Sequence, residues 1–245
     1  MTRDVVVAAS YALAPGADGR VLGFDPVAAG VPRKHLKTMT RAVQLGLAAA
    51  RAAIAAWPAW ADVPPLRRGM YVAASPQSGE ADDLAPALSA MGGAHDLGVF
   101  AAQAVPLIPP LWLVKGLSNN VLGYASAHHD IQGDNGNWCD GALGGAVALH
   151  QAVWAVAEGR VDVAVVGGSD ALVGAEAIVG GPCGEGAAFF VLVPGSAVGR
   201  AVRVVGPPQE PPPGDRALGA ATVPLGFAAA LGVSAPFRLA GLAVD

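Results

Sequence analysis

The protein has 245 residues, a length that suits one large domain or a tight pair of domains. Hydrophobic residues make up 53% of the chain and charged residues 14%, against about 25% charged residues in ordinary soluble domains, so its weakly charged surface predicts a missing partner. The net charge of −4 comes without a run of Lys or Arg, which excludes the electrostatic footprint of a protein that binds nucleic acid or an anionic membrane.

The apolar runs do not predict a membrane segment. The first, VVVAASYALA, lacks a basic leader and is too short to span a bilayer, and charge, glycine or proline interrupts the others. We therefore expect a cytoplasmic protein. Its two cysteines, Cys139 and Cys183, are then expected to be reduced thiols.

Strands and helices are predicted to alternate along the chain. Residues 4–10 and 68–75 are apolar runs typical of strands that are covered on both faces. The segment from Arg33 to Trp57 has the composition and spacing of a helix, and residues 81–129 predict several shorter helices. The alternation predicts an α/β fold with a mostly parallel, five-stranded sheet and helices on both faces.

The stretch NGNWCDGALGGAVALHQAVWAVAEGRVDVAVVGG, residues 135–168, predicts a strand, a tight glycine turn, a long helix and a second strand. In several enzyme folds such a turn lifts a nucleophile to the start of the helix. Cys139 lies near the turn and is the first candidate. Two further strands are predicted in GEGAAFFVLVP and RAVRVVG.

The composition changes after Gly206. Proline-rich residues 207–219 predict an extended linker between a domain of residues 1–206 and a tail of residues 220–245. The tail is small and apolar, and we expect it to pack on the domain or on a partner.

The segments GRVDVAVVGGSDAL and GEGAAFFVL resemble the two signatures that follow the active-site helix in β-ketoacyl synthases, which have the thiolase fold. RKHLKTMTRAVQLGLAAARAAI and PLIPPLWLVKGLSNNVLGYAS are similar to the first helix and the pre-nucleophile segment of that family, in the same order. The resemblance covers residues 4–206 and implies a thiolase-like fold equivalent to the N-terminal half of a ketosynthase.

The resemblance also implies which residue occupies the nucleophile position. Counting back from Gly167 and Gly168 by the family's spacing reaches Ala142, three residues after Cys139. A methyl group cannot attack a thioester, so the implied site has no nucleophile. Cys139 is then a small, buried residue; the alternative, a shifted turn with Cys139 as nucleophile, stays open.

The other polar candidates favour structural roles. The family's two decarboxylation histidines lie in the second half of a ketosynthase, and no histidine follows His150 here. His128 and His129 are expected to cap a helix or be solvated, because a metal or acid–base pair would lack a third ligand at suitable spacing. Glu185 is expected to hold a turn. No metal and no cofactor is predicted.

Three functions follow as hypotheses. The first is a non-catalytic subunit of the chain-length-factor type, which pairs with a full-length ketosynthase as a heterodimer, meets an acyl carrier protein through that complex, and shapes the acyl tunnel in type II polyketide or fatty-acid-like biosynthesis. The others are an independent acyltransferase that uses Cys139 and an acyl-binding scaffold protein. The residues expected at the tunnel or the interface are Trp112, Leu113, Leu117, Tyr124, Asn137 and Trp138.

Overall fold

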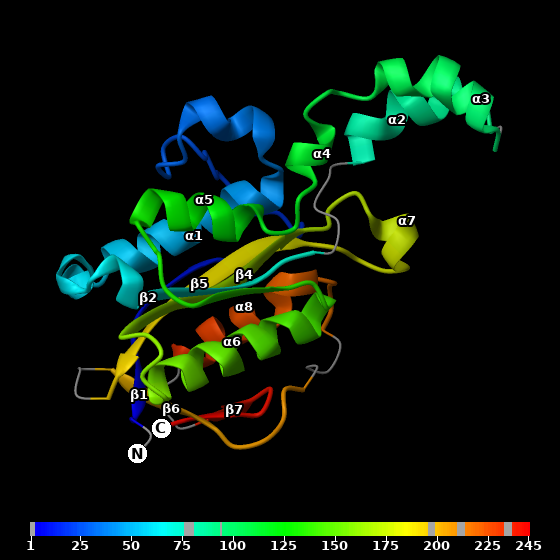
Figure 1. The fold of residues 1–245 in the computed structure, drawn as a ribbon. Coiled ribbons are helices and arrows are strands. Elements are labelled where there is room, and N and C mark those ends of the chain that lie inside the picture. Colours follow the sequence, from blue (N-terminus) through cyan, green and yellow to red (C-terminus); the bar gives the residue numbers. More distant parts are fainter. Residues whose placement is uncertain (1–2, 76–80, 94, 196–198, 210–213, 233–236) are drawn as a thin grey trace.

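The computed structural model describes residues 3–75, 81–93, 95–195, 199–209, 214–232 and 237–245. Within them, eight strands form one sheet in the order β3-β2-β4-β5-β1-β6-β8-β7 (Figure 1). The strands are β1 (Val5–Leu13), β2 (Arg68–Ala73), β3 (Asn135–Trp138), β4 (Val163–Ala171), β5 (Glu185–Pro194), β6 (Arg200–Val204), β7 (Phe237–Leu239) and β8 (Leu242–Val244).

The sheet is mixed, so the expectation of a mostly parallel, five-stranded sheet was wrong. Only β3, β2 and β4 run parallel to one another, and β5 returns antiparallel to β4. The connection from β4 to β5 holds only the single-turn helix α7 (Glu176–Val179), and a crossover to a parallel strand needs a longer segment. The α/β fold with helices on both faces is confirmed.

Helices cover the sheet on both sides (Figure 1). Helices α1 (Arg41–Ala55) and α5 (Asn120–His129) lie over one face, and α6 (Gly141–Ala157) and α8 (Thr222–Leu231) lie over the other. Successive residues of β5 serve different cores, because side chains alternate along a strand: Phe189 is buried with α1, whereas Phe190 is buried on the α6 side against Phe227.

The helix predicted from Arg33 to Trp57 is divided. A 3₁₀-helix, η1 (Arg33–Thr38), precedes α1, and the extended residue Met39 separates the two. Thr40 caps α1 by accepting a hydrogen bond from the Val43 amide at 3.4 Å. A threonine that binds the backbone in this way starts a new helix rather than continuing the old one.

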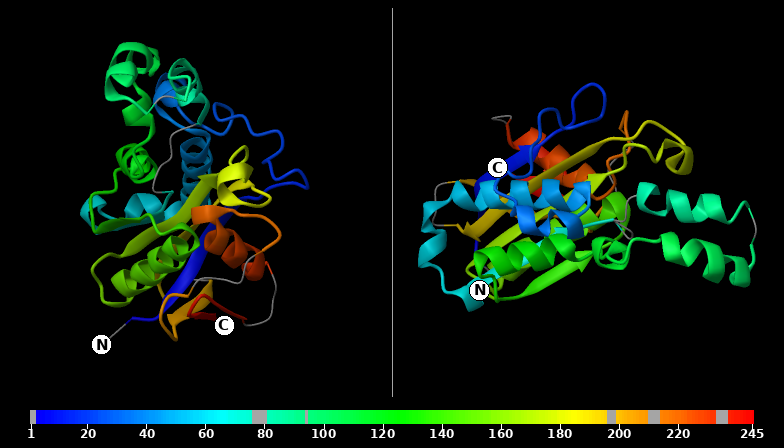
Figure 2. Two further views of the ribbon diagram at one scale, coloured as in Figure 1. Left: turned by 90° about the vertical axis from the view of Figure 1, so that its right-hand side faces the viewer. Right: turned by 90° about the horizontal axis from the view of Figure 1, so that it is seen from above.

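Residues 81–93 and 95–115 project from the sheet as a helical arm (Figures 1 and 2). Lys115 and Asp83 join the two ends of the arm at 2.6 Å. Eight large apolar side chains between residues 88 and 117 remain exposed: Leu88, Leu97, Val105, Leu107, Leu111, Leu113, Val114 and Leu117. Its helices are α2 (Ala81–Ala90), α3 (Leu97–Val99), the π-helical turn η4 (Phe100–Ala104), η5 (Val105–Leu107) and α4 (Trp112–Lys115).

The described residues after 218 belong to the same sheet and core. A 3₁₀-turn, η6 (Gly219–Ala221), leads into α8, and β8 pairs with β6. The buried ring of His150 on α6 is hydrogen-bonded to the Ala240 carbonyl at 2.9 Å. Part of the expected linker, residues 210–213, lies outside the described residues, and the division at residues 206 and 219 stays a prediction.

Short 3₁₀-helices η2 (Pro58–Asp62) and η3 (Pro65–Arg67) join α1 to β2. Of the helices that the structure describes, none is both long and apolar enough to cross a membrane.

A glycine in α6 sets the distance to α8. A Cβ at Gly145 would lie 2.6 Å from Pro224 Cδ, whereas a Cβ at Gly123, on α5, would meet no atom within 4 Å. We predict that Gly145→Ala lowers the free energy of unfolding by about 1–3 kcal/mol, because overpacking displaces α8. Gly123→Ala is the matched control and should raise it by about 0.5–1 kcal/mol. Urea unfolding of both variants measures the difference; equal values would contradict this packing.

Candidate functional site

The predicted strand–turn–helix is present at the edge of the sheet. Strand β3 pairs with β2 on one side, and its other side has no strand within the part of the chain that the structure describes. The Trp138 ring stacks on Tyr71, with ring centroids 6.3 Å apart and planes 15° apart. Trp138 therefore fixes the end of β3, from which the chain turns into α6.

The turn that follows β3 places Ala142 at the start of α6. Gly141, the first helical residue, has φ +53°, a left-handed conformation that glycine adopts without strain. Ala142 comes next, where the first turn of a helix has amide groups without intrahelical acceptors. Such amides stabilise a thiolate or an oxyanion in enzymes, but the side chain here is a half-buried methyl group.

Cys139 lies before the turn, not in it. Its Sγ is half-buried and lies 3.3 Å from the Asn137 amide nitrogen. A nucleophilic cysteine usually pairs with a histidine, but four of the five histidines have their ring contacts elsewhere: His35 and His128 contact Tyr124, His129 contacts Trp60, and His150 contacts Trp154. The expectation that Cys139 is buried was wrong: the residue is partly exposed, because it lies at the end of the edge strand β3. Burial raises the pKa of the other thiol, Cys183, above its usual value.

A cavity of about 670 Å³ lies between the arm and the ends of β4 and β5. Apolar side chains from two segments face it, including Leu84, Leu88 and Trp112 on the arm and Leu172 and Ile178 after β4. Five charged residues also line it: Arg20, Arg41, Asp82, Asp170 and Glu185. Its size and the apolar part of its walls have room for an acyl chain.

Asp170 is a buried residue of this cavity that sequence reasoning missed. Its carboxylate accepts hydrogen bonds from Ser75 Oγ at 2.5 Å and from the Ala220 amide at 3.0 Å. Burial raises its pKa above the usual value. Asp170 joins the chain after β2 to the turn before α8. A carboxylate near the end of the apolar run that forms β4 was the available sequence signal.

Glu185 has the structural role that was expected. Its buried carboxylate accepts hydrogen bonds from Arg41 at 2.7 Å and from the Val21 amide at 2.9 Å. These bonds attach the long loop after β1 to the start of α1.

The glycine pair Gly167 and Gly168 packs against neighbouring backbone. A Cβ at Gly168 would lie 2.5 Å from the Ala220 carbonyl oxygen.

The candidate tunnel residues lie in different places. Trp112 lines the large cavity, whereas Leu113 and Leu117 are 72% and 51% exposed on the arm and just after it. Tyr124, on α5, faces η1 instead, where its hydroxyl is 2.6 Å from Thr38 Oγ1. Asn137 and Trp138 are on β3, as the sequence predicted.

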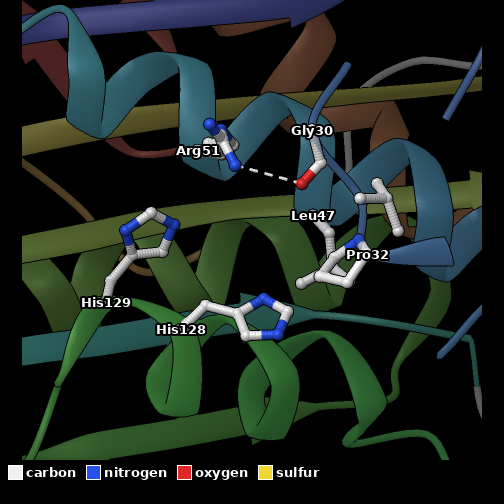
Figure 3. Close-up of a pocket in the computed structure, with 7 residues that line it drawn as sticks. Gly30, Pro32, Leu47, Arg51, His128 and His129 are labelled. Atoms are coloured by element: carbon white, nitrogen blue, oxygen red, sulfur yellow. Dashed lines mark hydrogen bonds between the residues drawn. The ribbon is translucent and has the colours of Figure 1, made fainter. Parts of the chain in front are cut away.

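His128 and His129 end α5 and line a second, smaller cavity with Arg51 (Figure 3). No group of three or more His, Cys, Asp or Glu side chains in the described residues is placed to hold a metal ion. Burial lowers the pKa of His129 to about 4, and burial also lowers the pKa of His128.

The turn, the glycine pair and the sheet match one known family. The sequence profile described as "Beta-ketoacyl synthase, N-terminal domain" matches residues 8–186. The chain belongs to the β-ketoacyl synthase family. No protein with a curated function matches this ketosynthase-like chain.

Solved ketosynthase structures share its fold. One, titled as a type II PKS acyl-carrier protein in complex with its ketosynthase bound to the hexaketide (AntDE:AntF), is 18% identical, with a TM-score of 0.64 over 79% of this chain and 63% of that one. The ishigamide ketosynthase/chain length factor is also 18% identical, with a TM-score of 0.64 over 84% and 63%. A β-ketoacyl synthase from Burkholderia phymatum STM815 is 17% identical, with a TM-score of 0.60 over 79% and 59%. The chain therefore spans less than two thirds of the ketosynthase chains it matches.

The depressed pKa of His129 predicts acid sensitivity. A folded-state pKa of about 4, below the ordinary 6.5, means that the unfolded chain binds the proton more tightly. Its contribution to stability is complete above pH 6.5 and is lost as the pH falls towards 4, with a slope of at most about 1.4 kcal/mol per pH unit. Urea unfolding between pH 7.5 and 4 should show this loss, and His129→Gln should reduce the slope. An unchanged slope in the variant would contradict the assignment to His129.

Proposed function

We propose that this chain is a non-catalytic ketosynthase-like subunit of the chain-length-factor type. It pairs with an active ketosynthase in the cytoplasm, receives no acyl group itself, and shapes the tunnel into which the partner's acyl chain grows. Membership of the ketosynthase family, together with a methyl group at the nucleophile position, carries the proposal.

The structure of the turn supports a lost rather than a displaced nucleophile. Gly141 still gives the turn its left-handed conformation, and α6 still begins directly behind it. An active enzyme would need a thiol or hydroxyl among the first amides of the helix. Ala142 provides neither, and Cys139 lies at the strand end before the turn.

Two surfaces suit a large protein partner. The arm exposes Leu97 and Leu113, which are 85% and 72% accessible. Apolar groups that gather on a projecting segment mark interaction sites. Strand β3 is the second surface, because the outer side of an edge strand is a template for a strand of another chain.

The large cavity is the proposed end of the tunnel. Trp112 lines it and belongs to the arm that the partner would contact, so the acyl chain could enter from the interface and stop against the indole. Filling an already packed apolar space costs about 1–3 kcal/mol per misfit group, enough to stop elongation at a defined length.

The proposed function first makes a prediction about acyl transfer. After incubation with an acyl-loaded carrier protein, intact-protein mass spectrometry should detect no acyl adduct on the chain. Ala142→Cys puts a thiol beside the free amides of α6, which lower a thiol's pKa, and this variant should react with iodoacetamide at least about tenfold faster than Cys139. A stable acyl adduct on Cys139 in the unchanged protein would instead establish the independent acyltransferase.

The second prediction concerns assembly. Leu97→Asp puts a charge on the arm and should abolish co-purification with a co-expressed ketosynthase, because a buried, unpaired carboxylate is costly. Val205→Asp is the matched control: Val205 is also exposed, at 48%, but follows β6 on the opposite half of the sheet, and this variant should still pair. A chain that remains a monomer beside every ketosynthase tested would favour the scaffold hypothesis.

The third prediction concerns chain length. Trp112→Gly enlarges the cavity and should shift the product of the heterodimer to longer chains without stopping condensation. Tyr124→Phe removes a hydroxyl that bonds to Thr38 outside the cavity and should leave the product unchanged. Product masses from the reconstituted complex measure both effects; an unchanged product from an intact Trp112→Gly complex would rule out this gate.

A further inference from the structure

The smaller cavity lies on the opposite face of the sheet from α6 and the empty nucleophile position. It has a volume of about 230 Å³ and lies between α1 and α5 (Figure 3). Seven residues line it: Gly30, Val31, Pro32, Leu47, Arg51, His128 and His129. The proposed function uses none of them.

Basic groups from two helices converge on this cavity. Arg51 comes from the exposed side of α1, and the His128 and His129 rings rise towards it from the last turn of α5 (Figure 3). Arg51 Nη1 donates a hydrogen bond to the Gly30 carbonyl at 3.0 Å. Gly30 has φ +87°, and a Cβ there would lie 2.6 Å from Arg51 Cζ. The absence of a side chain at Gly30 therefore leaves room for the guanidinium.

The charges around the cavity are unbalanced. None of the seven residues that line it has a carboxylate. Besides burial, the groups that lower the pKa values of the two imidazoles are all basic: Lys34, His35 and Arg51 act on His128, and Arg51, His128 and Arg68 act on His129. The adjacent carboxylate, Asp130, instead accepts a hydrogen bond from Gln132 at 2.6 Å.

The carbonyl groups at the end of α5 do not repel an anion in this cavity. The carboxyl end of a helix has a partial negative charge, but Arg68 Nη1 donates to the His129 carbonyl at 3.0 Å and to the Asp130 carbonyl at 3.3 Å. Arg68 is buried, and its guanidinium also lies 5.0 Å from the centre of the Trp60 ring. Its charge is held behind the cavity and compensates the carbonyl groups.

We propose that this cavity binds a phosphate group, either free or as the monoester of a small organic molecule. The planar guanidinium of Arg51 supplies paired N–H donors that match phosphate oxygens, and His128 and His129 supply further donors from the opposite wall. Val31, Pro32 and Leu47 form the apolar part of the lining, against which the organic part of a monoester would pack.

The proposal links binding to protonation. Neighbouring cations and burial keep the two imidazoles neutral near pH 7 in the empty cavity. A bound dianion reverses the local charge and raises both pKa values. Affinity for a dianion should therefore increase as the pH falls from 7.5 to 5.5. Sulfate tests this because its own charge is constant over that range.

Isothermal titration of the full chain, at ionic strength held constant with NaCl, tests the proposal. Inorganic phosphate and phenyl phosphate are the two probes, and acetate tests selectivity. We expect saturable binding of one phosphate probe per chain. Arg51→Met should weaken it by about tenfold or more, since a charge-assisted hydrogen bond is lost. Arg203→Met removes an equal charge from the exposed ion pair with Asp245 and should have no effect.

The probes separate the two sources of the phosphate group. Equal affinities indicate a free anion, and tighter binding of phenyl phosphate indicates a monoester. If the affinity for sulfate rises at low pH in the unchanged chain but not in His129→Gln, the link to protonation is supported. His129→Gln also serves as the second variant if Arg51→Met fails to fold. No saturable binding of either phosphate, equal binding by Arg51→Met, or acetate binding as tight as phosphate would overturn the proposal.

Discussion

Strand β4 is the constraint on which the rest of the structure depends, because its two glycines admit no side chain. A Cβ at Gly167 would overlap the Ala188 carbonyl oxygen, and one at Gly168 would lie 2.5 Å from the Ala220 carbonyl oxygen. The strand is buried along almost its whole length and pairs with β2 and β5. Neighbouring backbones thus approach β4 closely, and their positions follow from it.

Two buried carboxylates hold the loops around the large cavity in place. Asp170 joins Ser75 to the turn before α8, and Glu185 joins Arg41 to the loop after β1. Removing a donor from either carboxylate would leave a buried acceptor unsatisfied, at a cost of about 1–3 kcal/mol. Both carboxylates are held by structural hydrogen bonds and so shape the cavity.

In the proposed function, the molecule keeps the frame of a ketosynthase site without its nucleophile. The turn at Gly141 and the start of α6 are intact, yet the side chain at the reactive position is a methyl group. The exposed apolar arm and the open edge of β3 are the features through which such a frame would act on a partner. The basic cavity between α1 and α5 shares no lining residue with the large cavity, so its proposed anion would not occupy the place of an acyl chain at the arm.

The sequence by itself determined the family, the helices on both faces and the strand–turn–helix around Ala142, because these depend on local spacing and on patterns within single segments. The direction of β5 depended on the short connection that precedes it, and the junction of η1 and α1 depended on the Thr40 cap. Only the tertiary structure brought Arg51 and Gly30 to His128 and His129. These residues come from segments far apart in the chain, and the packing of α1 against α5 makes them neighbours.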